Sequence, residues 1–103
     1  MKKFINGLRF DTKKAELIAD YEYGHQGDHG WLYEAIYRTA RGNWFLAGNG
    51  GARSKYGERV DQNTYGAGEA LIPLSADEAL AWLERHGETD AIEAYFSDKI
   101  SDA

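Results

Sequence analysis

The pattern of hydrophobic and polar positions predicts a β-hairpin at the start of the chain. Two short apolar runs, Lys3–Ile5 and Leu8–Phe10, flank the dipeptide Asn6-Gly7. Asn-Gly between apolar runs favours a two-residue hairpin turn, because both central residues of that turn adopt positive φ. We therefore expect two short antiparallel strands within residues 3–10.

The pattern then changes to a helical period. Asp11 suits an N-cap, and the apolar residues that follow share one face of a helix over residues 12–21. These apolar residues are Ala15, Ile18 and Ala19. Residues 23–30 contain three glycines among polar residues, which is typical of a loop. The sequence thus predicts an N-terminal helix followed by a loop.

A second hairpin is predicted by strict alternation over residues 31–39. Tyr33 and Tyr37 fall on one face of this strand, and Glu34 and Ile36 fall on the other. Residues 40–42 form the turn, and residues 43–47 return as the partner strand. One further short strand is expected over residues 69–74, where Pro73 suits the end of a strand or a sheet edge.

Two helices are predicted at the C-terminal end. Ser75 and Glu78 form a capping box, and Gly87 suits the position just after the helix. A second helix begins at Thr89, and its apolar residues lie at helical spacing. The two buried stripes are Ala79, Leu80, Trp82 and Leu83, and Ile92, Tyr95 and Phe96. We expect residues 97–103 to fray.

Together these elements predict a single α+β domain over residues 1–103. Its small antiparallel β-sheet would consist of two hairpins plus one further strand, packed by one N-terminal and two C-terminal helices. The length of 103 residues fits one domain, and an apolar content of 43% is enough for a core. No apolar run approaches the roughly 20 residues of a membrane span, and no signal peptide is evident. The absence of cysteine suits a reducing compartment, so we expect a cytoplasmic protein without a membrane association.

Charge is unevenly distributed along the chain. Residues 1–74 contain ten Lys or Arg and nine Asp or Glu, for a net charge of +1. Residues 75–103 contain two and eight, for a net charge of −6. This acidic helical segment is either a solvated helix surface or a face for a basic partner, such as the nucleic-acid groove of another protein. The residues predicted to form the acidic face are Glu84, Glu88, Asp90, Glu93 and Asp98.

The glycine-rich segment of residues 48–68 is the main candidate for a binding surface. It carries half of the glycines, together with three cations and two tyrosines, but it matches neither a Walker A loop nor a dinucleotide-binding fingerprint. Glycines can expose backbone N–H groups to an anion, and cations beside aromatic residues suit protein recognition or nucleic-acid contact. The predicted binding residues are Trp44, Arg53, Ser54, Lys55, Tyr56, Arg59 and Tyr65. The competing interpretation is that Trp44 or Phe45 belongs to the core and Tyr56 packs the segment down.

Other candidate chemistry is weaker. His25, Asp28 and His29 could ligate a metal ion, but the surrounding glycines indicate a solvated loop, so we predict no metal site and no cofactor. No pair of carboxylates has a spacing that fixes acid–base chemistry, and Ser54 lacks the context of a catalytic nucleophile. We therefore predict that the protein is not an enzyme.

Three stretches resemble a family of short proteins carried by prophages and conjugative elements. They are KKFINGLRFDTKKAELIA, YEAIYRTARGNWFLAGNGGARSKYGERV and GAGEALIPLSADEALAWLERHG. Genes of this size and setting include inhibitors of host defence, notably anti-CRISPR proteins, so the resemblance implies a setting rather than a mechanism. The leading hypothesis is a non-catalytic binding protein that occludes a surface of a larger host protein or nucleoprotein complex. The alternative is a phosphate- or nucleic-acid-binding module that uses the 48–68 segment.

Overall fold

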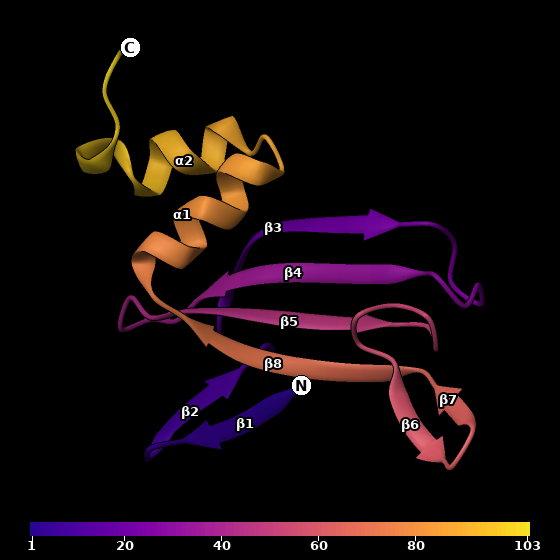
Figure 1. Cartoon of the computed structure of the whole chain (residues 1–103). Helices are drawn as coiled ribbons and strands as arrows, with labels where there is room; N and C mark the ends of the chain where they lie inside the picture. Colours follow the sequence, from indigo (N-terminus) through magenta and orange to yellow (C-terminus); the bar gives the residue numbers. More distant parts are fainter.

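The computed structural model describes all 103 residues and is built around a four-stranded antiparallel sheet (Figure 1). The elements in chain order are β1 (Lys2–Ile5), β2 (Leu8–Asp11), β3 (Glu16–Tyr23), β4 (Leu32–Arg38), β5 (Trp44–Gly50), β6 (Glu58–Asp61), β7 (Thr64–Gly66), β8 (Gly68–Leu74), α1 (Ala76–Arg85), α2 (Thr89–Tyr95) and the 3-10 helix η1 (Ser97–Lys99). The strands of the central sheet lie in the order β3-β4-β5-β8, while β1–β2 and β6–β7 are separate hairpins. No helix is long and apolar enough to cross a membrane.

Both faces of the central sheet are covered, each by a different part of the chain. Trp44 and Leu46 of β5 belong to a core that includes residues of α1, whereas Phe45 between them packs against Phe10 of β2. Because successive side chains of a strand point to opposite faces, the helices and the β1–β2 hairpin lie on opposite sides of the sheet. The helix-side core consists of Ile36, Trp44, Leu46, Ala79, Trp82, Leu83 and Phe96. The smaller core under the hairpin consists of Phe10, Phe45 and Leu71.

The two predicted hairpins form, but the prediction that they share one sheet is wrong, because β1–β2 is a separate sheet and β3 is the strand that joins β4, β5 and β8. Asn6 and Gly7 have φ of 51° and 78°, as their turn requires, and Ile5 pairs with Leu8 across it. In the second hairpin, Glu34 and Ile36 face the helices, while Tyr37 stacks on Phe45 on the opposite face. The alternation read from the sequence therefore assigns the faces of β4 correctly.

The predicted N-terminal helix is wrong, because most of residues 12–21 belong to strand β3. Asp11 does cap a turn, since its side chain accepts a hydrogen bond from the Lys13 N–H and its carbonyl accepts from Ala15. The chain then extends and pairs with β4 from Glu16 onward, with a register shift between Leu17 and Ala19. Pairing with β4 buries apolar surface that would stay exposed in an isolated amphipathic helix. Tertiary contacts therefore override the local helical period.

The C-terminal helices begin and end close to the predicted positions. Ser75 accepts a hydrogen bond from the Glu78 N–H, and the Glu78 carboxylate accepts one from the Ser75 N–H. Gly87 has φ of +66°, which suits the turn between the helices. Residues 97–103 were expected to fray, but η1 forms there and Lys99 makes an ion pair of 2.9 Å with Asp77. Phe96, just before η1, is buried against Trp44 at a ring separation of 5.1 Å.

Candidate functional site

The 48–68 segment is structured, rather than one long loop. Strand β5 continues to Gly50, residues 51–57 fold back over the sheet, and the β6–β7 hairpin follows before β8. Several N–H groups of residues 51–57 donate to partners inside the protein. Gly51 and Arg53 donate to the carbonyls of Trp31 and His29, and Ser54 and Gly57 donate within the loop. These N–H groups therefore do not form the open anion-binding nest that the glycine content suggested.

The glycines of this segment serve close packing. A Cβ atom on Gly48 would lie 2.1 Å from the ring of Tyr56, and one on Gly50 would lie 2.2 Å from Ser54 Oγ. At Gly51, an added Cβ would lie 2.4 Å from the carbonyl oxygen of Asp28. None of the three adopts positive φ. Glycine is needed here because the loop approaches the sheet and the neighbouring loop too closely for a side chain.

A buried carboxylate holds the loop, the sheet and helix α1 together. Glu34 of β4 is only 2% exposed, and its two oxygens receive three donors from distant parts of the chain. Tyr56 Oη donates to Oε2, Trp82 Nε1 donates to Oε1 over 3.1 Å, and Lys55 Nζ lies 2.6 Å from Oε2. We call this group the Glu34 cluster. Because two of its donors come from the 51–57 loop and the third comes from α1, the cluster fixes the position of that loop on the sheet.

The electrostatics of the Glu34 cluster favour an ionised carboxylate at neutral pH. Burial raises the pKa of Glu34, but the hydrogen bonds from Lys55, Tyr56 and Trp82 together lower it more, so the pKa lies below its ordinary value. Burial, and then the Glu34 hydrogen bond, raise the pKa of Tyr56 well above 10. Glu34 is thus a charged acceptor with both oxygens engaged, which suits a structural role better than proton transfer to an external substrate.

His86 extends this cluster at the end of α1. Its ring lies between Tyr21 and Trp82, with ring centroids 4.4 Å and 4.2 Å away. Burial lowers the pKa of His86, with the nearby Glu34 opposing that shift. The arrangement packs the end of α1 on the sheet.

The structure separates the seven predicted binding residues into two groups. Trp44 and Tyr56 are buried, Ser54 hydrogen-bonds within the loop, and Lys55 is paired with Glu34. This is the competing interpretation of the sequence, in which Trp44 is core and Tyr56 packs the segment down. The other three, Arg53, Arg59 and Tyr65, are exposed and make no hydrogen bond or ion pair with the Glu34 cluster, with Tyr65 59% exposed. Arg59 donates to the carbonyls of Asp61 and Gln62 in its own hairpin.

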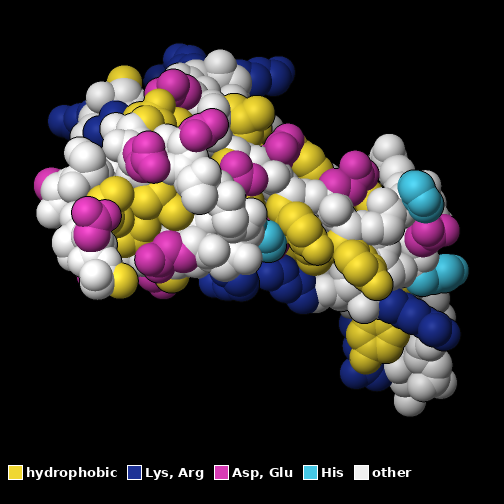
Figure 2. Space-filling view, turned by 90° about the horizontal axis from the view of Figure 1, so that it is seen from above, with side chains coloured by type: hydrophobic (Ala, Val, Ile, Leu, Met, Phe, Trp, Pro, Cys, Tyr) yellow, Lys and Arg dark blue, Asp and Glu magenta, His cyan; other side chains and the backbone are white.

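Arg53 and Tyr65 lie beside the loop of residues 24–30, and Arg59 pairs with Tyr65 across the β6–β7 hairpin. The Arg53 N–H donates to the carbonyl of His29 within this loop, and the Gly51 N–H donates to the carbonyl of Trp31 just after it. A groove of about 480 Å³ is lined by residues of both loops and of β7. Asp28 and His29 line this groove, but no group of three or more His, Asp or Glu side chains is arranged to hold a metal ion. Figure 2 shows the histidines of this loop at the end of the molecule remote from the helices.

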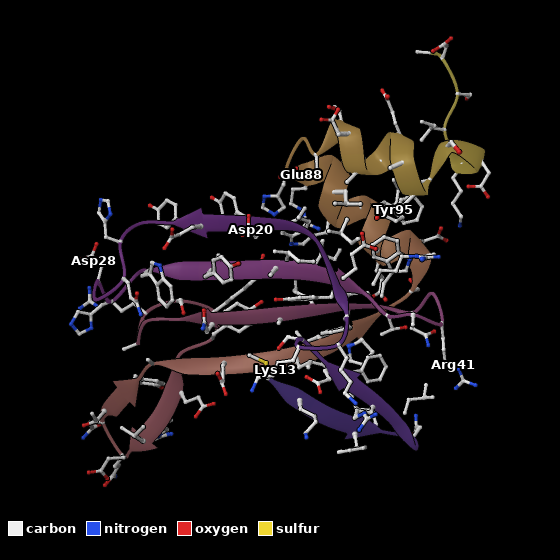
Figure 3. The ribbon with its side chains drawn as sticks, turned by 180° about the vertical axis from the view of Figure 1, so that it is seen from behind. Lys13, Asp20, Asp28, Arg41, Glu88 and Tyr95 are labelled. Carbon is white, nitrogen blue, oxygen red and sulfur yellow. The ribbon has the colours of Figure 1, made fainter.

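The predicted acidic face lies on the helical layer. Figure 2 shows Asp and Glu side chains spread over this helical layer, around a small hydrophobic patch. Glu84, Asp90, Glu93 and Asp98 are exposed, and Glu88 at the junction of α1 and α2 is partly exposed (Figure 3). None of these five makes an ion pair within 4 Å, so their charge is available to a partner.

Sequence reasoning missed a basic groove on the other side of the sheet. Arg9, Lys14 and Arg41 line it, together with residues of the β1–β2 hairpin and the turn between β4 and β5. The signal in the sequence was the net charge of residues 1–15. This short segment contains five Lys or Arg and one Asp, for a net charge of +4. The net charge of only +1 over residues 1–74 concealed this local excess of positive charge.

Comparisons of this chain with family models, curated proteins and solved structures find no match.

Proposed function

We propose that this protein is a non-catalytic binding protein that covers a basic surface of a larger protein or nucleoprotein complex. The observation that carries the proposal is the acidic layer formed by residues 75–103, whose net charge is −6. Its carboxylates are displayed on two packed helices and a 3-10 helix on one side of the sheet. Such a surface resembles a nucleic-acid backbone in the sign of its charge, and it can therefore attract the same basic surface.

The rigidity of the acidic layer supports this function. Helix α1 is held to the sheet by the buried residues Ala79, Trp82 and Leu83, and Trp82 also donates to Glu34. Carboxylates on a fixed scaffold lose little freedom on binding, and their long-range field accelerates association with a basic partner. A groove that normally holds nucleic acid would be occupied by the helices instead.

A second contact region lies at the end of the molecule that carries the groove between the 24–30 loop, the 51–57 loop and β7. Arg53, Arg59 and Tyr65 are exposed there, and Arg and Tyr are residue types that often dominate binding energy at interfaces. In this proposal the acidic layer supplies most of the electrostatic attraction, while Tyr65 and the arginines fix the orientation. We further propose that the partner is a host defence effector, as expected for a short protein of a prophage or conjugative element.

The test compares two variants that change the net charge equally. The helix-face variant carries Glu84→Gln, Glu93→Gln and Asp98→Asn, and the remote control carries Asp28→Asn, Glu58→Gln and Glu69→Gln. All six carboxylates are exposed, and no hydrogen bond or ion pair involves their side chains. The control leaves Arg53, Arg59 and Tyr65, the proposed residues of the second contact region, unchanged. Each protein is used as bait in the native host, and the recovered proteins are quantified by mass spectrometry.

The expected result is a partner that wild type and control recover and that the helix-face variant loses. The purified partner should then release the protein when its own nucleic acid is added, because both compete for one basic surface. Equal recovery by the helix-face variant and the control would rule out the acidic layer as the contact. Recovery unaffected by nucleic acid would rule out competition for a basic groove.

A further inference from the structure

The basic groove lies between two turns that meet on the side of the sheet away from the helices. One wall is strand β2 and the bend after it, and the other is the turn of residues 39–43 between β4 and β5. Its volume is about 350 Å³, and Arg9, Lys14 and Arg41 all line it. Figure 3 shows Arg41 at the tip of the β4–β5 turn, on the same side as Lys13 and the β1–β2 hairpin.

The cations of this groove have no partner within the protein. The two ion pairs of the structure involve Lys55 and Lys99, so Arg9, Lys14 and Arg41 are unpaired. Asp11 is the acidic residue in the groove, and its side chain already accepts a hydrogen bond from the Lys13 N–H. That bond lowers the pKa of Asp11, and the charges of Lys2, Lys14 and the N-terminal amine lower it further. Positive charge therefore dominates this surface.

An exposed aromatic residue accompanies the cations. Phe4 is 65% exposed and pairs with Arg9 across the β1–β2 hairpin, while the neighbouring pair on the same face is Lys2 with Asp11. The opposite face of this hairpin places Ile5 and Phe10 against the sheet, so the hairpin does not need Phe4 for its core. Aromatic residues exposed beside unpaired cations are characteristic of single-stranded nucleic-acid binding, in which bases stack and phosphates are neutralised.

We propose that the basic groove and the exposed face of the β1–β2 hairpin bind single-stranded nucleic acid. Arg9, Lys14 and Arg41 contact backbone phosphates, and Phe4 stacks on a base. An isolated phosphate or a lipid headgroup would use the cations but would gain nothing from Phe4. This inference goes beyond the proposed function, because it concerns the face of the sheet opposite to the acidic layer and a different class of ligand.

The test measures anisotropy of a labelled single-stranded oligonucleotide of about 15 nucleotides with the full-length protein at low salt. The groove variant carries Arg9→Gln, Lys14→Gln and Arg41→Gln. A matched control, Arg53→Gln with Arg59→Gln and Arg85→Gln, removes the same charge from exposed positions elsewhere. We expect the groove variant to lose at least tenfold in affinity and to flatten the salt dependence by about two in logarithmic slope, since each single-strand phosphate contact contributes about 0.7.

Variants of Phe4 distinguish binding of nucleic acid from binding of other anions. We expect Phe4→Ala to weaken oligonucleotide binding by about tenfold and Phe4→Trp to restore it, while tripolyphosphate affinity stays unchanged in both variants. The proposal is overturned by undetectable oligonucleotide binding at low salt, or by equal losses in the groove variant and its matched control. Equal displacement by tripolyphosphate with no effect of Phe4→Ala would identify a general anion site instead. Thermal unfolding of each variant establishes that the fold is retained.

Discussion

Glu34 joins a strand, a loop and a helix that are far apart in the sequence. Strand β4 places it beneath the 51–57 loop, where it receives Tyr56 and Lys55 from that loop and Trp82 from α1. A buried charge is tolerated only when its hydrogen-bonding capacity is met. The Lys55 side chain remains 58% exposed, so solvent screens that ion pair and the two neutral donors become correspondingly important.

Replacement of this carboxylate should destabilise the protein in a pH-dependent way. In Glu34→Gln the amide N–H₂ replaces one carboxylate oxygen, so it faces either the Trp82 N–H or both Tyr56 and Lys55. We expect a loss of about 1–3 kcal/mol in unfolding free energy at pH 7. The folded pKa of Glu34 lies below its unfolded value of about 4.3, so its contribution is complete above that pH and is lost as pH falls through the folded pKa. Urea unfolding from pH 7 to acid should show the gap between wild type and variant closing. A gap that stays constant would contradict an ionised Glu34.

Gly48 tests whether the loop packs as closely as the structure indicates. In Gly48→Ala the new methyl group would overlap the Tyr56 ring, 2.1 Å from Cζ, and would disturb the bond to Glu34. We expect a loss of about 1–3 kcal/mol, typical of overpacking. Gly30→Ala is the matched control, because an added Cβ there meets no atom within 4 Å. Its effect should stay within about 0.5 kcal/mol. Equal midpoints of thermal unfolding for the two variants would refute close packing at Gly48.

At the scale of elements, the β6–β7 hairpin projects from the sheet without contributing to either core. Every residue from Glu58 to Tyr65 is exposed, including Val60 and Tyr65. Glu58 pairs directly with Gly66, so the hairpin can be shortened there by a two-residue Asn-Gly turn in place of residues 59–65. We expect the shortened protein to unfold cooperatively with a free energy within about 1 kcal/mol of wild type. A large loss would assign the hairpin to the folding core instead.

Elements with local signals were predictable from sequence. Asn6-Gly7 determines its turn through backbone conformation, and Ser75 with Glu78 determines a helix start through two short-range hydrogen bonds. Strand β3 was not predictable in this way, because residues 15–19 fit a helical stripe and the preference for strand arises from pairing with β4. An alternation over Ala19, Tyr21 and Tyr23 was present, but it was too short to outweigh the helical period.

The candidate site, too, was predictable from the sequence only where its signal is local. The acidic segment follows from counting charges along contiguous residues, and the structure places those charges on one layer. The engagement of Tyr56 and Trp82 with Glu34 joins residues 22 and 48 positions apart, so no local pattern contains it. The basic groove joins Arg9 and Lys14 to Arg41 through the packing of two hairpins, which again requires the tertiary structure.

The whole molecule is flat, with extents of 49 × 35 × 20 Å, and only 16 of its 103 residues are buried. A sheet with helices on one face and a hairpin on the other keeps two charged surfaces apart. The acidic layer and the basic groove are therefore separate, and a net charge of −5 conceals an excess of each sign at different places.

Segregation of like charges predicts that salt stabilises the fold. Repulsion within the acidic layer is strongest at about 10 mM salt, where the screening length is about 30 Å, and fades toward 1 M, where it is about 3 Å. Glu84 and Glu93 also lie near the C-terminal ends of α1 and α2, where a carboxylate opposes the helix dipole.

The helix-face variant defined above should therefore melt a few degrees higher than wild type at low salt, on the order of 2–5 °C, with the difference shrinking as salt is added. The remote control should show a smaller difference, because its three carboxylates come from separate elements. Scanning calorimetry across the salt series distinguishes the two, and identical salt dependence of both variants would mean that the helical carboxylates do not act as one charged surface.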